Sequence, residues 1–313
     1  MRLSPRRTPI FAAVLLALGS TANAVPADPP PGPVHDRAFW RRIVEKEYAL
    51  PEGESAAALV RELSGYLGSP DPELRDEFGY GIPAAWIGEQ QRLAPAELRD
   101  LVRQWTANLQ AGIGESGTDT VLRRSFSALN LATIAAYDKE HPFLDAGEVR
   151  SLLDAALAYL AAEKDLRGYD PQKGWIHAVA HAADLVAALA ANRHLGKAEH
   201  GRILDAVSVR LSSAGAVFTW GEQERLAEVI AALVRRPDFQ PASLDPWLAR
   251  LAADSEKLWQ EGARIDPAHF AAVQNGKDVL RYLFVSLARE ETAGAAAARA
   301  KILKALQDSL TGL

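Results

Sequence analysis

The sequence predicts an all-α protein whose helices form an α/α superhelix of the HEAT or armadillo kind, in a single curved domain. Three observations lead to this prediction. Alanine and leucine dominate the chain after residue 35, and no segment alternates convincingly as a strand does. Helical patterns follow one another with short Pro, Gly or Asp punctuation. The second helices of the expected pairs recur about every 45 to 55 residues, slightly longer than the usual period of such repeats. A closed α/α toroid and a non-repeating bundle are the alternatives.

The first 24 residues have the layout of a secretory signal peptide. Arg6 and Arg7 belong to a basic start, residues 10–18 form a short apolar run, and Ala22 and Ala24 occupy the positions of an A-x-A cleavage site. We therefore expect Sec-type export, cleavage after Ala24, and a periplasmic or secreted protein. The alternative is a buried N-terminal helix, which the following proline-rich segment disfavours.

Residues 25–35, "VPADPPPGPVH", contain five prolines and predict a disordered linker. The helical-repeat domain is expected to cover residues 36–313. The formal charge of the whole chain is −5, and it is about −8 without the three arginines of the signal. This balance argues against nucleic-acid partners, which require clustered positive charge. No later segment is apolar for long enough to span a membrane, so we expect a soluble protein.

The helices can be assigned in order along the chain. A first one is expected in residues 69–87, where Ser69 and Asp71 are candidate caps and Pro72 occupies the first turn. Four helix pairs follow, at 95–110 with 119–138, 145–163 with 175–192, 197–213 with 221–236, and 243–260 with 268–289. In a two-helix solenoid the second helices usually line the concave wall, so they are expected to form a common groove.

The segment "GWIHAVAHAAD", residues 174–184, carries the chemistry that stands out most. With His177 at zero on a helical wheel, His181 falls near 40° and Asp184 near −20°. These three side chains would form a narrow polar stripe on a helix whose other faces are apolar. The loop at 164–175 adds Trp175 at the start of that helix, and loops with aromatic and charged residues often bind ligands.

The other second helices carry comparable stripes. One holds Arg123 with Ser127 and Asn130, another holds Glu224 with its neighbours, and the last holds Lys277 and Arg281. The predicted groove residues are Trp175, His177, His181, Asp184, Arg123, Glu224, Lys277 and Arg281.

Three interpretations of the histidines remain open. Imidazoles at i and i+4 can bind one Zn²⁺ with a carboxylate as third ligand, which makes His177, His181 and Asp184 candidate metal ligands. A zinc protease of the H-E-x-x-H kind is excluded because Ala178 stands where the glutamate is required. The residues can also form a metal-free polar site, or they can be structural.

Several blocks of the sequence resemble those of a bacterial family catalogued as domain of unknown function 2785. They are "SPDPELRDEFGYGIPAAWI", "RRSFSALNLATIAAYD", "RGYDPQKGWIHAVAHAADL", "FTWGEQERLAEVIAAL" and "NGKDVLRYLF", within about residues 38 to 290. The resemblance implies an all-helical, repeat-like architecture and implies no reaction.

Two classes of function follow. The first is an exported binding protein without a cofactor, whose concave polar groove takes a protein segment or an envelope ligand. The second is a hydrolase-like enzyme that uses His177 and His181, with or without zinc. The sequence contains no G-x-S-x-G, P-loop or dinucleotide-binding fingerprint and no cysteine, which excludes the chemistries that depend on them.

Overall fold

A computed structural model of the chain describes residues 34–260 and 264–310. The predicted signal peptide, residues 1–24, lies outside the described residues, as does the predicted linker apart from Val34 and His35. His35 is held in place, because its Nδ1 lies 2.8 Å from the Glu62 carboxylate and its ring stacks on Phe39 at 4.0 Å. The described chain is mostly helical, as the sequence predicts, and it also contains one small two-stranded sheet.

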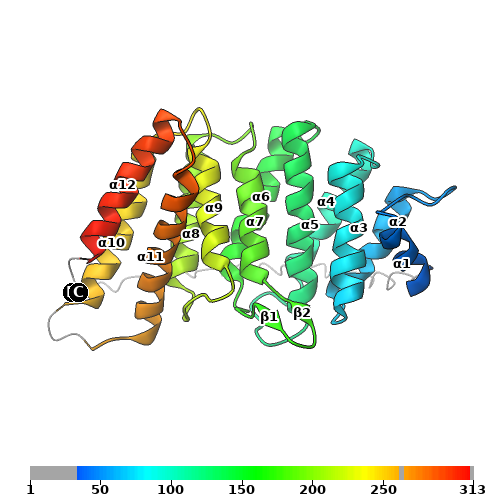
Figure 1. Cartoon of the computed structure of the whole chain (residues 1–313), viewed down its shortest axis with the longest axis horizontal. Helices are drawn as coiled ribbons and strands as arrows, with labels where there is room; N and C mark the ends of the chain where they lie inside the picture. The colour runs from blue at the N-terminus through cyan, green and yellow to red at the C-terminus, as the bar shows by residue number, and fades with distance from the viewer. Residues whose placement is uncertain (1–33, 261–263, 311–313) are drawn as a thin grey trace, which may run out of the picture. The chain divides into compact units, whose positions relative to one another are not determined.

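The N-terminal part consists of short elements (Figure 1). They are α1 (Arg37–Glu45), α2 (Ala56–Leu63), the 3₁₀ helix η1 (Ser64–Gly68), the π-helix η2 (Glu73–Gly81), α3 (Ile82–Ala84) and the π-helix η3 (Ala85–Glu89). Longer helices follow, namely α4 (Pro95–Asn108), α5 (Thr120–Glu140), α6 (Ala146–Ala162), α7 (Ala178–Ala190), α8 (Lys197–Ser212), α9 (Glu222–Val234), α10 (Asp245–Leu258), α11 (Pro267–Leu287) and α12 (Ala293–Leu310). A 3₁₀ helix, η4 (Pro241–Leu244), precedes α10.

From α4 onward most helices lie in two rows. The second row consists of α5, α7, α9 and α11, which pack side by side in that order (Figure 1). The first row consists of α4, α6, α8 and α10, and each of its helices packs on the second-row helix that follows it in the chain. These are the four helix pairs that the sequence predicts. The η2 and η3 segments pack against α5 and so extend the second row toward the N-terminus.

Side-chain caps explain several of the helix starts. Asp145 accepts hydrogen bonds from the backbone N–H of Gly147 and Glu148, while the Glu148 carboxylate accepts from the Asp145 N–H. This reciprocal capping box fixes the start of α6. The expected caps near residue 70 are also present, because Glu73 N–H donates to Asp71 at 2.9 Å and Asp71 N–H donates to Ser69 at 3.1 Å.

The segment that follows those caps is not an ordinary α-helix. It forms the wide turns of η2 and η3, with the three-residue α3 between them. Pro83 lies within α3 and has no N–H to donate, so the usual hydrogen-bond ladder cannot run unbroken through this segment. Such wide turns are rare and occur frequently at functional sites.

The predicted helix at 175–192 starts later than expected. Residues before it form a hairpin in which β1 (Tyr169–Asp170) pairs antiparallel with β2 (Gly174–Trp175). The Asp170 carboxylate closes the turn by accepting two backbone N–H groups at 2.9 Å, and Gly174 adopts a φ of +71°. The helix α7 therefore begins only at Ala178, and His177 precedes it.

Within the described ranges, no helix is both long enough and apolar enough to cross a lipid bilayer. The core lies between the two rows and is built from aliphatic side chains together with fully buried tryptophans. Trp105 of α4 is an example, because its indole N–H donates to Ser64 Oγ at 2.9 Å and so satisfies its one polar atom inside the core.

Candidate functional site

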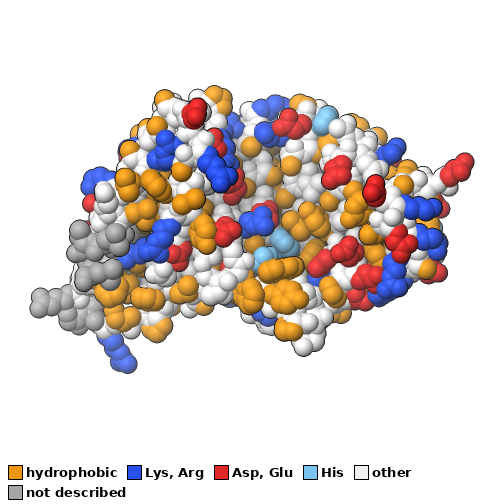
Figure 2. Space-filling model, viewed as in Figure 1, with side chains coloured by type: hydrophobic (Ala, Val, Ile, Leu, Met, Phe, Trp, Pro, Cys, Tyr) orange, Lys and Arg blue, Asp and Glu red, His pale blue; other side chains and the backbone are white. Residues whose placement is uncertain are grey.

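Three aromatic side chains gather at the N-terminal end of α7 and remain partly exposed. Tyr169 and Trp175 come from the hairpin, and Trp220 comes from the loop before α9; they are 45%, 42% and 44% exposed. The ring centroids of Trp175 lie 5.1 Å from Tyr169 and 6.2 Å from Trp220, and His177 stacks on Trp175 at 4.3 Å. We call Tyr169, Trp175 and Trp220 the aromatic cluster. Figure 2 shows an apolar patch with histidine beside it, where Figure 1 draws the hairpin.

The position of Trp220 depends on a glycine of another element. A Cβ atom added to Gly168 would lie only 2.0 Å from Cγ of Trp220, so the indole ring packs directly on the Gly168 backbone. The Gly168 carbonyl also accepts the Ile176 N–H at 2.8 Å, which closes the hairpin. The contact between Gly168 and Trp220 thus packs the hairpin against the loop before α9, and it leaves no room for a side chain at position 168.

A buried arginine of η2 ties the hairpin to the helical rows. Arg75 is fully buried, and its guanidinium donates to the backbone carbonyls of Lys173 at 2.6 Å and Trp175 at 3.1 Å. It also lies over the ring of Phe126, 4.6 Å from the centroid, and pairs with Asp76 at 2.8 Å. Burial raises the pKa of Asp76 to about 6, although its partner Arg75 opposes this shift.

His181 lies beneath the aromatic cluster and is almost fully buried. Its Nδ1 is 2.8 Å from Ser125 Oγ, and the Ser125 hydroxyl donates to the Ile176 carbonyl at 2.5 Å. Since a hydroxyl has one proton to donate, the Nδ1–H of His181 is the donor to Ser125 and Nε2 carries the lone pair. Burial, together with the positive neighbours of the ring, lowers the pKa of His181 to about 3, so the imidazole is neutral at physiological pH.

His177 precedes α7 in a left-handed conformation, with a φ of +48°. Its Nε2 lies 2.6 Å from the Trp220 carbonyl, and its ring lies 5.7 Å from that of His181 in an edge-to-face arrangement. The helical wheel predicted from the sequence is therefore wrong for this residue, because His177 does not lie on the helix. The backbone of His177 turns the chain from the hairpin into α7, and its side chain joins the two aromatic-bearing loops.

Polar side chains continue from this point across the second row. Asp184 of α7 pairs with Arg225 of α9 at 3.2 Å, and Tyr80 of η2 lies close to Thr133 of α5. Burial raises the pKa of Asp184, while Arg225 opposes the shift. Farther along, Glu224 of α9 lies close to the exposed Tyr282 of α11. We call Asp184, Arg225, Glu224 and Tyr282 the polar strip.

The predicted metal ligands do not converge on one point. Nδ1 of His181 is engaged with Ser125, Nε2 of His177 with the Trp220 carbonyl, and Asp184 with Arg225. In the part of the chain that the structure describes, no group of three or more His, Asp or Glu side chains is placed to hold a metal ion. The Ser125–His181 contact does not form a nucleophile–base pair either, because the hydroxyl proton is directed to a carbonyl and the serine is fully buried.

The remaining predicted groove residues lie apart from the histidines. Arg123 is exposed next to Gly68 of η1, and Lys277 lies on α11 facing a pocket toward α10. Arg281 pairs with Asp278 on its own helix at 2.5 Å. Glu224 does belong to the polar strip. Trp175, His177 and His181 are the predicted residues whose rings contact one another.

The stripe predicted on α5 is wrong in its orientation. Ser127 and Asn130 are fully buried, with Asn108 of α4 donating to Ser127 Oγ and Asn130 donating to the Gly79 carbonyl of η2. They face the first row and η2, respectively, so they cannot line an open groove. Small polar side chains that satisfy buried neighbours look the same in a sequence as those that face solvent.

A second buried charged group was missed by the sequence reasoning. Arg124, fully buried, donates to the equally buried Glu163 carboxylate at 2.6 and 2.9 Å. Arg210 donates to the Glu163 backbone carbonyl, and Asp165 binds Arg167 and the Gly117 N–H. These contacts fix the loop that leads into the hairpin. The adjacent pair Arg123–Arg124 is the available sequence signal, although it does not show which arginine is buried.

Searches of curated proteins and of solved structures each gave no significant match. A family model described as "Protein of unknown function (DUF2785)" matches residues 109–285. The match covers more than half of the chain and includes the hairpin, His177 and His181, two of the four helix pairs in full, and most of the pair formed by α10 and α11. It confirms the resemblance to this family and contains four of the five sequence blocks, while the block at 69–87 lies outside the matched residues. The chain belongs to this family of proteins of unknown function.

Proposed function

We propose that this protein is an exported binding protein whose second row of helices forms the inner wall of an α/α superhelix and holds a segment of another protein. The aromatic cluster would anchor an apolar side chain of that segment. The polar strip would hydrogen-bond its backbone and its polar groups.

The exposed aromatic cluster is the observation that carries this proposal. Large aromatic side chains at the surface are enriched among the residues that dominate binding energy at protein interfaces. Here three of them are close to half exposed, although the chain fixes them through Gly168, Arg75 and His177. A fixed apolar anchor loses little conformational entropy when it binds, which favours recognition.

The polar strip supports a polypeptide partner rather than a nucleic acid. Its charges alternate in sign, with Asp184 and Glu224 beside Arg225. Tyr282 and Val285 are exposed on α11, the next helix of the second row. Figure 2 shows positive and negative groups interspersed with apolar ones over α7, α9 and α11. An extended peptide offers alternating apolar and polar groups that match such a surface.

The export part of the proposal rests on the N-terminal sequence. Its basic start, short apolar run and A-x-A site are what a signal peptidase requires. Expression of the full chain in a bacterial host, followed by N-terminal sequencing of the envelope fraction, tests it. We expect a mature chain that begins at Val25, and an uncleaved chain in the cytoplasm would contradict export.

Peptide display against the purified protein tests the binding function. We expect selected peptides to share an apolar anchor and to lose at least tenfold in affinity in Trp175→Ala and Trp220→Ala. Phe270→Ala is the control, because Phe270 is 38% exposed on α11 but lies outside the aromatic cluster. Equal binding by all variants would refute the proposed surface. Stoichiometric zinc that is lost when His177 and His181 are replaced by alanine would favour the hydrolase hypothesis instead.

A further inference from the structure

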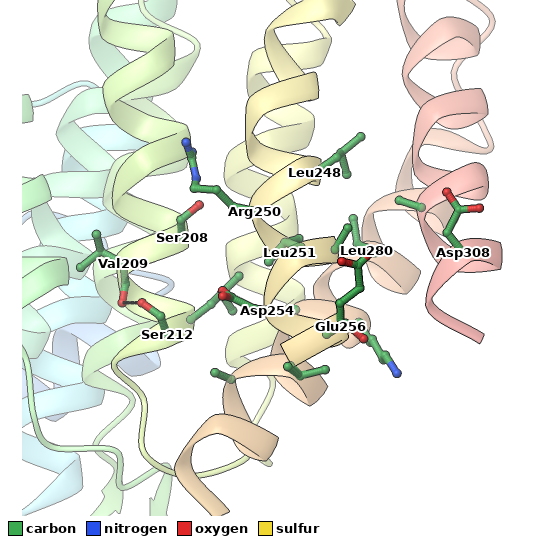
Figure 3. Close-up of a pocket in the computed structure, with 18 of the residues that line it drawn as sticks. Ser208, Val209, Ser212, Leu248, Arg250, Leu251, Asp254, Glu256, Leu280 and Asp308 are labelled. Carbon is green, nitrogen blue, oxygen red and sulfur yellow. Dashed lines mark hydrogen bonds between the residues drawn. The ribbon is translucent and has the colours of Figure 1, made fainter. Parts of the chain in front are cut away.

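A pocket lies far along the chain from the aromatic cluster. Its volume is about 510 Å³, and its walls come from α8, α10, α11 and α12 (Figure 3). Pockets of a few hundred cubic ångströms are the usual size for small-molecule sites. None of the residues that line it belongs to the aromatic cluster or the polar strip.

The body of this pocket is apolar. Leu248 and Leu251 of α10, Val273 and Leu280 of α11 and Ala305 of α12 contribute to its walls. Gly276 of α11 contributes too, and a Cβ added there would lie 3.1 Å from Leu251, so α10 and α11 approach closely at this point. Such a lining favours an aliphatic or otherwise apolar molecular body.

One polar atom in the wall is buried without a hydrogen-bond partner. The Ser208 hydroxyl of α8 has none among the described residues, and it lines the pocket. In Figure 3 its oxygen is directed from α8 toward α10. A buried hydroxyl left unpaired is costly, and a ligand with a polar end can satisfy it.

Most of the charged side chains that line the pocket have a partner of opposite charge. Arg250 pairs with Asp205 at 2.7 Å, Asp254 lies 3.7 Å from Lys257, and Lys304 pairs with Asp308 at 2.8 Å.

Two charged side chains of the lining have no ion pair among the described residues: Glu256, which is exposed at the rim, and Lys277. Lys277 is half-buried in the wall. Burial and the neighbouring Arg281 lower the pKa of Lys277, as expected for a desolvated cation that lacks a counter-ion.

We propose that this pocket binds an amphiphilic acid, with an aliphatic body between α8, α10, α11 and α12 and an acidic head that pairs with Lys277. The Ser208 hydroxyl donates a hydrogen bond to an oxygen of the bound molecule. A fatty acid has this chemistry. The site is separate from the protein-binding surface proposed above and does not depend on it.

Titration calorimetry of the purified protein with dodecanoate tests the proposal, with dodecanol and dodecylamine as matched probes. We expect saturable binding of one equivalent of dodecanoate, at least tenfold tighter than either probe. Lys277→Met should remove that preference for the acid while dodecanol binding stays unchanged. Ala305→Leu, which fills the pocket, should weaken both dodecanoate and dodecanol.

Two further variants keep the outcome clear. Ser208→Ala should weaken dodecanoate severalfold while the unliganded protein keeps or raises its melting temperature, because an unpaired hydroxyl is removed. Trp175→Ala should leave dodecanoate binding unchanged, which separates this site from the aromatic cluster. Absence of binding, equal affinity for the amine, or insensitivity to both Lys277→Met and Ala305→Leu would overturn the proposal.

Discussion

Replacing Arg75 with methionine tests whether one buried side chain fixes the aromatic-bearing hairpin. Arg75 has no exposed surface, donates to the carbonyls of Lys173 and Trp175, and pairs with Asp76. Methionine fills a similar volume and keeps the contact with Phe126, but it offers no donor. The change therefore leaves the hairpin carbonyls and a half-buried carboxylate without their partner.

The expected cost is large for a single substitution. Breaking a buried ion pair by removing one partner costs about 3–5 kcal/mol. Asp76 can limit that cost by taking up a proton, because its pKa is already raised to about 6. We therefore expect the free energy of unfolding to fall by about 3 kcal/mol at pH 7, and the near-ultraviolet circular dichroism of the tryptophans to change because the hairpin loosens.

Urea unfolding followed by far-ultraviolet circular dichroism measures the loss. The matched control is Arg103→Met, because Arg103 also pairs with an aspartate, Asp100, but the two side chains are 69% and 46% exposed. Exposed pairs contribute less than about 1 kcal/mol. If both variants lost less than about 1 kcal/mol, or if the tryptophan signal of the Arg75 variant stayed native, the assigned role of Arg75 would be wrong.

Three more predictions concern the same site. Burial raises the pKa of Asp76 from 3.8 to about 6, so between these pH values the native state keeps a proton that the unfolded chain has lost. The free energy of unfolding of the wild type should therefore fall by up to about 3 kcal/mol as the pH rises from about 4 to about 6. Asp76→Asn should remove this fall when unfolding is measured across pH. The pKa of His181 is lowered from 6.5 to about 3, so the free energy of unfolding should instead fall as the pH drops below about 6.5. His181→Gln should flatten this dependence on pH. If the variant kept the pH dependence of the wild type, the ring of His181 would be hydrated and not buried. Gly168→Ala should displace Trp220, which should appear as a shifted fluorescence emission and a lower melting temperature, whereas native values would contradict the close packing.

The helix pairs could be predicted from the sequence because each is a long amphipathic segment with its own start signals. The pair at 145–163 and 175–192 illustrates both the strength and the limit of this reasoning. Asp145 and Glu148 cap the first helix in the structure. The second helix starts late, since the hairpin before it depends on Gly174 and on hydrogen bonds from the side chain of Arg75, about a hundred positions away. No local pattern reports such contacts.

The segment that carries the candidate site could be singled out from the sequence, but its geometry could not. His177 and Trp175 do contact each other, as their proximity in sequence suggested. His181 was expected to face a groove, but Ser125 and Phe126 of α5 enclose it. A helical wheel gives the angle of a residue about its own axis, and it does not show which neighbouring helix covers that angle. For the same reason Trp220 could not be assigned to the site, because only the packing of α7 on α9 brings it there.

The wide turns of η2 set a limit on how the length of this segment can change. Deleting a single residue between Glu73 and Gly81 would remove length that the wide turns accommodate. It would also rotate one end of the segment by about 100° relative to the other. Arg75 and Tyr80 could then no longer keep their partners in the hairpin and on α5 at the same time. Natural relatives that keep this site should therefore carry insertions and deletions on either side of η2, in the loops at 69–72 and 90–94, and not inside it.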